Sequence, residues 1–143
     1  MHHEQVQYEA IASRFQLHRK LGQGCFATVY LATHLDTGLN VAVKIISKAK
    51  CTNFELIKNE VTALQLVNEH PNIVDVYEIA EDSQCVYIVM EYCAGGNLHD
   101  FIVANGSLPE SRARLWFGQL VTAVEYCHGL GVVRMPTLRM PMC

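Results

Sequence analysis

The chain has 143 residues, half of them apolar and 17% charged, a balance typical of a globular protein with one modest core rather than of a disordered chain. Its formal net charge is −3 and no basic run stands out, so no nucleic-acid partner is predicted. The longest apolar runs, such as residues 86–90, are far too short to span a membrane, and residues 1–5 lack the apolar core of a signal peptide.

The six cysteines show no CxxC spacing. We interpret them as free thiols in the reducing interior of a cell, cytoplasmic or nuclear, and predict neither a disulfide framework nor a metal site. They are Cys25, Cys51, Cys85, Cys93, Cys127 and Cys143.

The first elements in chain order are a polar lead-in and two strands. Residues 1–14 form the lead-in, with at most a short helical turn through residues 8–11. Alternating apolar and polar residues then predict a strand over residues 15–21. A second strand is predicted over residues 28–33, which are rich in β-branched and aromatic side chains.

The turn between these strands is rich in glycine. Gly22 and Gly24 have no Cβ atom, so they let a phosphate approach the backbone and permit a positive φ in a tight turn. Taken alone, an ordinary glycine-containing hairpin explains both residues. A dinucleotide-binding fold fits poorly, because its glycines lead from a strand into a helix, whereas here they lead from strand to strand.

A third strand is predicted over residues 39–46, after a turn in which Gly38 is free to adopt a left-handed conformation. Strand alternation places Ala42 and Lys44 on one face. The other face carries the apolar residues Val41, Val43 and Ile45.

Next comes a helix from about residue 53 to residue 68, with Glu60 beside its apolar stripe. The stripe consists of Phe54, Ile57, Val61, Leu64 and Val67. Residues 75–80 and 85–92 are predicted to form the fourth and fifth strands. Five strands and one helix make a small α+β lobe.

The composition changes at the glycine-containing residues 94–96, which we interpret as a hinge. A short helix is predicted over residues 97–104. Residues 107–110 have the spacing of a capping box, with Pro109 in the first turn of a longer helix, residues 111–127. The apolar face of that helix consists of Ala113, Trp116, Phe117, Leu120, Val121 and Val124.

A glycine turn followed by the strand sequence Val41-Ala42-Val43-Lys44 resembles the nucleotide site of the protein kinase family. The resemblance covers about residues 15–133 and is strongest to the serine/threonine branch related to calcium/calmodulin-dependent kinases. It implies a kinase-like N-terminal lobe over residues 15–92, with a five-stranded antiparallel sheet plus one helix. The hinge and the first helices of an incomplete C-terminal lobe would follow over residues 93–133, and a divergent tail over residues 134–143.

The resemblance implies that the chain binds ATP. Lys44 would hold the α- and β-phosphates and pair with Glu60 on the helix. Ala27 stands where a third glycine is usual, and Asn97 stands where many members carry an acid that binds ribose. Met90 would fill the back of the adenine pocket, and backbone groups after it would hydrogen-bond the base. The implied cofactor-binding residues are Leu21, Gly22, Gln23, Gly24, Cys25, Phe26, Ala27, Val29, Ala42, Lys44, Glu60, Met90, Glu91, Cys93 and Asn97.

The chain departs from the family pattern after Val133. The family continues with a histidine-arginine-aspartate loop, a lysine and an asparagine, whereas this sequence continues with Arg134-Met135-Pro136 and runs to Cys143. The family's catalytic base and metal ligands are therefore missing, so we predict no catalytic residue and no metal site, with Mg²⁺ present only as carried by the nucleotide. The chain is expected to be inactive alone, and the tail resembles the product of a variant reading frame or alternative exon.

Three functions are consistent with these patterns. The first is an ATP-binding fragment of a serine/threonine kinase, whose family reaction transfers a phosphoryl group from ATP to protein serine or threonine. The second is a regulatory or decoy module that binds the activators or scaffolds of a full-length kinase. The third is a non-functional product that is cleared. We expect the apolar face of helix 111–127 to fold back on the lobe, bind a protein partner or drive association.

Overall fold

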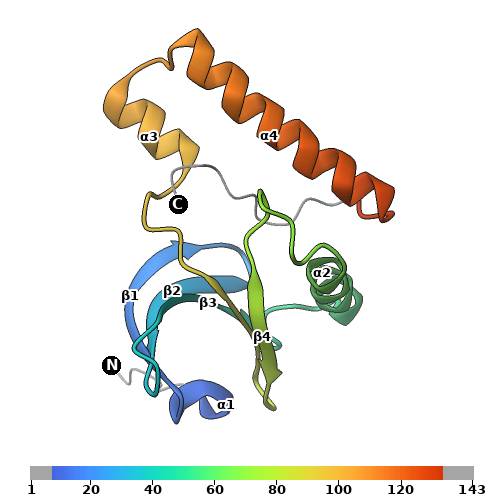
Figure 1. Cartoon of the computed structure of the whole chain (residues 1–143). Coiled ribbons are helices and arrows are strands. Elements are labelled where there is room, and N and C mark those ends of the chain that lie inside the picture. Colours follow the sequence, from blue (N-terminus) through green and yellow to red (C-terminus); the bar gives the residue numbers. More distant parts are fainter. Residues whose placement is uncertain (1–7, 134–143) are drawn as a thin grey trace. The chain divides into compact units, whose positions relative to one another are not determined.

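The computed structural model describes residues 8–133. Residues 1–7 of the predicted lead-in and the whole predicted tail (134–143) lie outside the described residues. Figure 1 shows the helices and strands, which in chain order are α1 (Glu9–Ala12), β1 (Phe15–Gln23), β2 (Ala27–His34), β3 (Asn40–Ser47), α2 (Phe54–Leu66), β4 (Val76–Glu81), β5 (Cys85–Glu91), α3 (Leu98–Asn105) and α4 (Glu110–Gly129).

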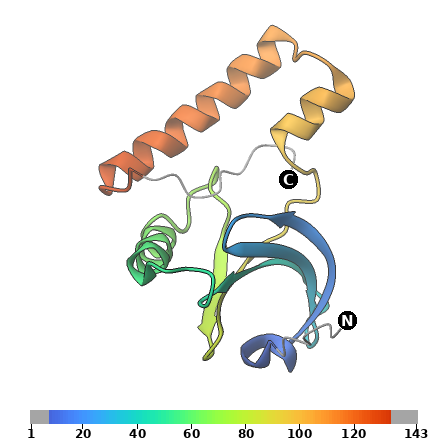
Figure 2. The same ribbon diagram turned by 180° about the vertical axis from the view of Figure 1, so that it is seen from behind.

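The five strands form one sheet in the order β1-β2-β3-β5-β4, which confirms the predicted five-stranded antiparallel sheet. Strands β1, β2 and β3 curl together, as Figures 1 and 2 show from opposite sides. The pairing of β1 with β2 shifts register between Leu17 and Lys20 and again between Lys20 and Gly22. Such irregularities increase the local twist of a strand and so favour a curved sheet.

The two faces of β3 have the environments that the sequence predicted. Val41 and Val43 are almost completely buried in an apolar cluster on one face of the sheet. Lys44, which points to the other face, is half-buried. The buried members of the cluster are Ile11, Phe15, Ala32, Val41, Val43, Ile45, Cys85, Tyr87 and Val89. The hydrophobic alternation of the strands therefore fixes which face Lys44 occupies.

The residues before β1 are part of this fold and not only a polar lead-in. Ile11 in α1 is 1% exposed, and the ring of Tyr8 meets that of Tyr87 edge-on at a centroid distance of 6.1 Å. Arg14 donates two hydrogen bonds to the carboxylate of Glu78, both 2.6 Å long. Such a bidentate pair is geometrically specific, so it fixes where the chain enters the sheet.

The described residues divide into two compact units. One comprises the residues through Phe54 together with Tyr77–Glu91, and it contains α1 and the sheet. The other comprises Glu55–Val76 together with the residues from Tyr92 onward, and it contains α2, α3 and α4. One boundary between the units follows Glu91, just before residues 94–96, which the sequence predicted to be a hinge.

The second unit has its own apolar cluster, which covers part of α4. The cluster joins Ala123 and Cys127 of α4 to residues that follow α2 and α4, and Trp116 of α4 is also buried. Its members are Val67, Ile73, Ala123, Cys127 and Val132. Phe117 and Val121, which the sequence placed on the apolar face, are 65% and 38% exposed. The other members of the predicted apolar face are buried (Trp116) or half-buried (Ala113, Leu120 and Val124), so Phe117 and Val121 form its exposed edge.

The predicted capping box at the start of α4 is wrong. The N-cap residue is Pro109, whose extended backbone (φ −56°, ψ 143°) lies outside the helix and whose side chain makes no capping hydrogen bond. Its carbonyl instead accepts hydrogen bonds from the N–H groups of Arg112 and Ala113, both 3.0 Å long. The proline ring has no acceptor atom, so the first N–H groups of this helix have no side-chain cap.

The C-terminus of α4 ends in a glycine-based cap. Gly131 has a φ of 76°, a conformation that glycine adopts without the penalty of a Cβ atom. Its N–H donates to the carbonyl of His128 (3.0 Å), and the N–H of Val132 donates to that of Cys127 (2.9 Å). This pair of bonds is a Schellman motif, which satisfies two carbonyls at the helix end.

The five cysteines among the described residues are free thiols, as predicted, and Cys143 lies outside the described residues. Within residues 8–133, no helix combines the length and the apolar character needed to cross a membrane.

Candidate functional site

The glycine turn connects β1 and β2 as a tight hairpin in the first unit. Gly22 pairs with Val29 in the sheet, and the N–H of Gly24 donates to the carbonyl of Ala27 over 2.8 Å. The carbonyl of Phe26 accepts a hydrogen bond from Ser47 at the end of β3 (2.9 Å). The phenyl ring of Phe26 is 45% exposed at the tip. The turn is therefore anchored to the sheet at both sides, with its tip in solvent.

Neither glycine of this turn is required by the fold of the described chain. A Cβ atom built at Gly22 meets no heavy atom within 4 Å, and one at Gly24 meets only the carbonyl oxygen of Ala27 at an ordinary 3.8 Å. Neither has a positive φ, so the left-handed turn that the sequence allowed is not used. Gly38 does use it, with a φ of 71°. Because Gly22 and Gly24 have no Cβ atom, a ligand can approach the backbone of the turn closely at both positions.

The strand register brings the predicted pocket walls together on one face of the sheet. Val29 lies opposite Lys44, and Ala42 lies opposite Met90. Ala42 and Met90 are buried, at 7% and 8% exposed. Directly opposite residues share a face, as do residues two apart along a strand. One half-buried ammonium group thus stands on a largely apolar surface beside the start of the glycine turn.

Two further residues belong to this face although the sequence analysis did not single them out. Leu31 lies opposite Ala42, and Ile88 lies opposite Lys44. Ile88 is completely buried, which places apolar contact area directly beside the lysine. The alternation of β2 and β5 is a signal that would have found both, because each is two residues from a predicted wall residue.

The remaining predicted residues lie at the end of β5 or in the second unit. Glu91 ends β5 and is half-buried. Cys93 accepts a backbone hydrogen bond from Gly96 (3.2 Å), which closes a turn just after the boundary between the units. Glu60 is an exposed residue of α2. Because Lys44 and Glu60 belong to different units, the ion pair between them stays a prediction.

Asn97 has a structural role that the sequence analysis did not assign. It is the N-cap of α3: its Oδ1 accepts a hydrogen bond from the N–H of Asp100, and its Nδ2 donates to the Asp100 carboxylate, both over 2.8 Å. An N-cap asparagine of this kind stabilises a helix by about 1 kcal/mol. A ribose hydroxyl would have to share the amide with these bonds.

Comparisons with known proteins agree with this arrangement. The family model described as "Protein kinase domain" matches residues 15–135. The chain is 43% identical over 122 residues to CBL-interacting protein kinase 3 of Oryza sativa subsp. japonica, covering 83% of this chain and 27% of that protein. It is 42% identical over 122 residues to CBL-interacting serine/threonine-protein kinase 26 of Arabidopsis thaliana, covering 83% and 28%.

The fold agrees with a solved kinase structure as well. The crystal structure titled "Rad53 1-466 in complex with AMP-PNP" superposes with a TM-score of 0.79 at 40% identity, covering 85% of this chain and 33% of that chain. The chain thus spans about a quarter to a third of the length of these relatives. Family match, relatives and fold lead to one conclusion: the chain belongs to the protein kinase domain family, in its serine/threonine branch.

Proposed function

We propose that the first unit binds ATP on the sheet face that carries Lys44. The adenine would lie against the apolar residues Ala42 and Met90, and the phosphates would lie under the glycine turn. The observation that carries this proposal is the absence of any need for glycine at Gly22 and Gly24 in the described chain. Close approach of a phosphate group to the backbone would explain why glycine stands at both positions. The similar Rad53 structure is a complex with AMP-PNP, a nucleotide.

Lys44 is the cation that this proposal uses. Its ammonium, on an apolar face opposite Val29, would hold the α- and β-phosphates. We propose that Glu60 of α2 approaches Lys44 in the nucleotide-bound protein. A half-buried ammonium group gains from an anion on each side, so the carboxylate would orient it toward the phosphates. Mg²⁺ would enter only as a ligand of the nucleotide.

We further propose that a polypeptide of these 143 residues transfers no phosphoryl group by itself. Phosphoryl transfer depends on a group that positions the attacking hydroxyl and on metal ions that neutralise charge on the transferred group. Where family members carry histidine-arginine-aspartate, this sequence reads Arg134-Met135-Pro136. The glycine turn and Lys44 bind phosphate but perform neither of those two tasks.

A thermal-shift titration with Mg-ATP tests the binding proposal. At 100 times the dissociation constant, a ligand that binds only the folded state stabilises it by about 2.7 kcal/mol. For a domain of this size that is a rise in Tm of roughly 5–10 °C. Lys44→Ala should abolish the rise. Lys58→Ala is the matched control, since that lysine is 73% exposed on α2, and it should keep the full rise.

Equal shifts in wild type and Lys44→Ala would contradict the assignment of the site, and no shift in wild type would contradict nucleotide binding altogether. Transfer of ³²P from labelled ATP to a generic protein substrate should not exceed that of a boiled sample. Turnover that copurifies with the 143-residue chain and disappears in Lys44→Ala would contradict the proposed inactivity.

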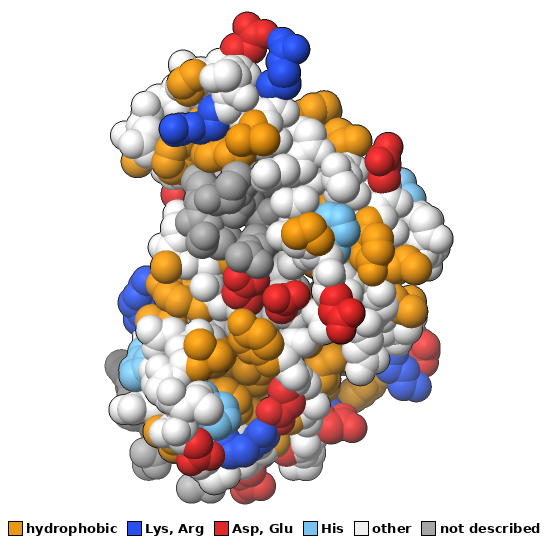
Figure 3. Space-filling model, viewed as in Figure 1, with side chains coloured by type: hydrophobic (Ala, Val, Ile, Leu, Met, Phe, Trp, Pro, Cys, Tyr) orange, Lys and Arg blue, Asp and Glu red, His pale blue; other side chains and the backbone are white. Residues whose placement is uncertain are grey.

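A second candidate function, a regulatory module, is favoured by the surface of α4. Leu115 and Phe117 are 58% and 65% exposed, and Figure 3 shows hydrophobic side chains on the surface along this helix. Exposed apolar side chains of this size favour association with another protein. In this function the chain would lower the activity of a longer kinase added to the same assay. Phe117→Ser should abolish that inhibition while Lys44→Ala should leave it unchanged, and the opposite pattern would exclude it.

A further inference from the structure

A hollow in the first unit lies on the opposite face of the sheet from Lys44. It encloses about 850 Å³, within the range of small-molecule sites. Its walls come from the glycine turn, the end of β3 and the residues after it, the β4–β5 turn, and Tyr8 ahead of α1. All of these residues belong to the first unit.

The strand register separates this hollow from the proposed nucleotide site. Thr28 and Ile45 line it and lie directly opposite each other in the sheet. Each is next in sequence to a residue of the nucleotide face, Thr28 to Val29 and Ile45 to Lys44. Because side chains alternate between faces, Thr28 and Ile45 point away from the nucleotide face. The hollow and the implied nucleotide-binding residues share residues 23–27, which form the glycine turn and its two strand ends.

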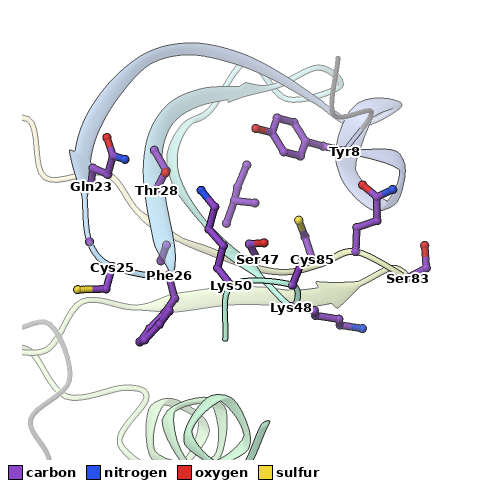
Figure 4. Close-up of a pocket in the computed structure, with 15 residues that line it drawn as sticks. Tyr8, Gln23, Cys25, Phe26, Thr28, Ser47, Lys48, Lys50, Ser83 and Cys85 are labelled. Atoms are coloured by element: carbon purple, nitrogen blue, oxygen red, sulfur yellow. The ribbon is translucent and has the colours of Figure 1, made fainter. Parts of the chain in front are cut away.

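Two lysines line the hollow, and they differ in direction. Figure 4 shows the side chain of Lys50 extending into the space enclosed by the curved strands, whereas Lys48 points toward the β4–β5 turn. There the Lys48 ammonium lies 3.0 Å from the Glu81 carboxylate and donates to the carbonyl of Asp82 over 2.6 Å. The charge of Lys48 is therefore balanced by the turn, and Lys50 supplies the positive charge of the hollow.

The anionic groups near the hollow are engaged with other partners. The Asp82 carboxylate accepts hydrogen bonds from the N–H groups of Gln84 and Cys85, both 2.8 Å long, and from the hydroxyl of Tyr87. Burial alone would raise the pKa of Asp82, but these hydrogen bonds lower it, so the group is a fully satisfied carboxylate. Burial raises the pKa of the Cys85 thiol, which leaves it neutral near pH 7.

The remaining lining combines an apolar floor with neutral polar groups. Ile45 and Cys85 are buried at 6% and 5% exposed. Tyr8, Thr28 and Ser47, which carry hydroxyl groups, also line the hollow, as Figure 4 shows. A concave surface of this kind, with one cation and several hydrogen-bonding groups, fits a ligand that has one anionic group on an apolar body.

We propose that this hollow, which we call the Lys50 hollow, binds a small organic anion, a carboxylate or phosphate ester with an aromatic or aliphatic body. The Lys50 ammonium pairs with the anionic group, and the hydroxyls of Thr28 and Ser47 complete its hydrogen bonds. The apolar body lies against Ile45 and Cys85. Binding here does not require ATP, because Thr28 and Ile45 on the strands that line the hollow face away from Lys44.

The test uses benzoate and phenyl phosphate as probes, with benzyl alcohol as the uncharged analogue, on ¹⁵N-labelled full-length chain carrying Lys44→Ala. This background removes the cation of the opposite face. The anions should shift the backbone amide resonances of Thr28, Ser47 and Lys50, and benzyl alcohol should bind at least roughly tenfold more weakly. Whichever anion binds more tightly identifies carboxylate or phosphate as the preferred chemistry.

Two variants test whether the charge of Lys50 and the open space of the hollow are needed for anion binding. Lys50→Ala should weaken both anions roughly tenfold or more, while the exposed Lys58→Ala should leave their affinity unchanged. Thr28→Phe fills the hollow without changing its charge, and phenylalanine is favourable in a strand, so the chain should fold and lose the anion shifts. The proposal would be overturned if the anions caused no shifts in the Lys44→Ala chain, or if they bound equally well after Lys50→Ala was added. It would also be overturned if benzyl alcohol bound as tightly as the anions, or if the shifts were confined to Ala42 and its neighbours. None of these outcomes bears on ATP binding by the chain with Lys44 intact.

Discussion

Alanine at Gly22 separates the functional from the structural role of the glycine turn. The position has no left-handed φ and a Cβ atom there meets nothing within 4 Å, so the folded chain accepts alanine without strain. The substitution removes conformational freedom from the unfolded chain, so Gly22→Ala should stabilise the protein without nucleotide by about 0.4–1 kcal/mol. For a chain of this size the rise in Tm is about 1–4 °C.

The same methyl group should weaken nucleotide binding. It holds a phosphate away from the backbone, and loss of one hydrogen bond to a charged group costs about 1.5–3 kcal/mol, or roughly 10- to 150-fold in Kd for Mg-ATP. Gly38→Ala is the contrasting control, because its φ of 71° makes alanine strained: it should lower stability by about 1–2 kcal/mol and leave the Kd unchanged. Urea unfolding and isothermal titration measure the two quantities. An unchanged Kd for Mg-ATP in Gly22→Ala would contradict a phosphate contact at Gly22, and a loss of stability would contradict the absence of strain there.

Three further predictions concern the first unit, each measured by urea unfolding. Ile11→Ala should cost about 2–5 kcal/mol, since the side chain is 1% exposed in the sheet cluster, and a loss below 1 kcal/mol would show that α1 is not docked. Tyr87→Phe should cost about 1.5–3 kcal/mol by removing the hydroxyl that hydrogen-bonds Asp82. Because hydrogen bonds hold the pKa of Asp82 below that of a free aspartate, that cost should be complete near neutral pH and shrink as pH falls through the folded pKa; a cost independent of pH into strong acid would contradict it. Glu78→Gln should cost at most about 1 kcal/mol, because both partners are about one-third exposed. The hydrogen bonds from Arg14 lower the pKa of Glu78 below that of a free glutamate, so this difference too should vanish in acid, and a constant difference would exclude the pair as its source.

The strands and their faces could be predicted from the sequence because the alternation of apolar and polar residues indicates which side chains are buried. Val41, Val43 and Ile45 are apolar at every second position, and burial of that face fixes the register of β3 and with it the face of Lys44. The ends of all five strands were predicted to within one residue, except the C-terminal end of β1, which lies two residues further along the chain. The residue types expected on the nucleotide face followed from that register.

What the sequence did not predict depends on contacts between distant residues. A four-residue helix with one large apolar residue, Ile11, is too short to show a period, so its docking leaves no local pattern. The face that α4 buries is set by Ile73 and Val67, which lie far away in sequence. The Lys50 hollow arises from the curvature of the sheet, which depends on irregular pairing in β1 and not on any motif.

Mapping Mg-ATP on the ¹⁵N-labelled chain tests the nucleotide face most directly. The account predicts that amide resonances of Gly22, Ala42 and Met90 shift on titration, that Lys44→Ala abolishes these shifts, and that Lys50→Ala leaves them unchanged. Shifts centred on Thr28 and Lys50 on the opposite face, or identical shifts in Lys44→Ala, would contradict it.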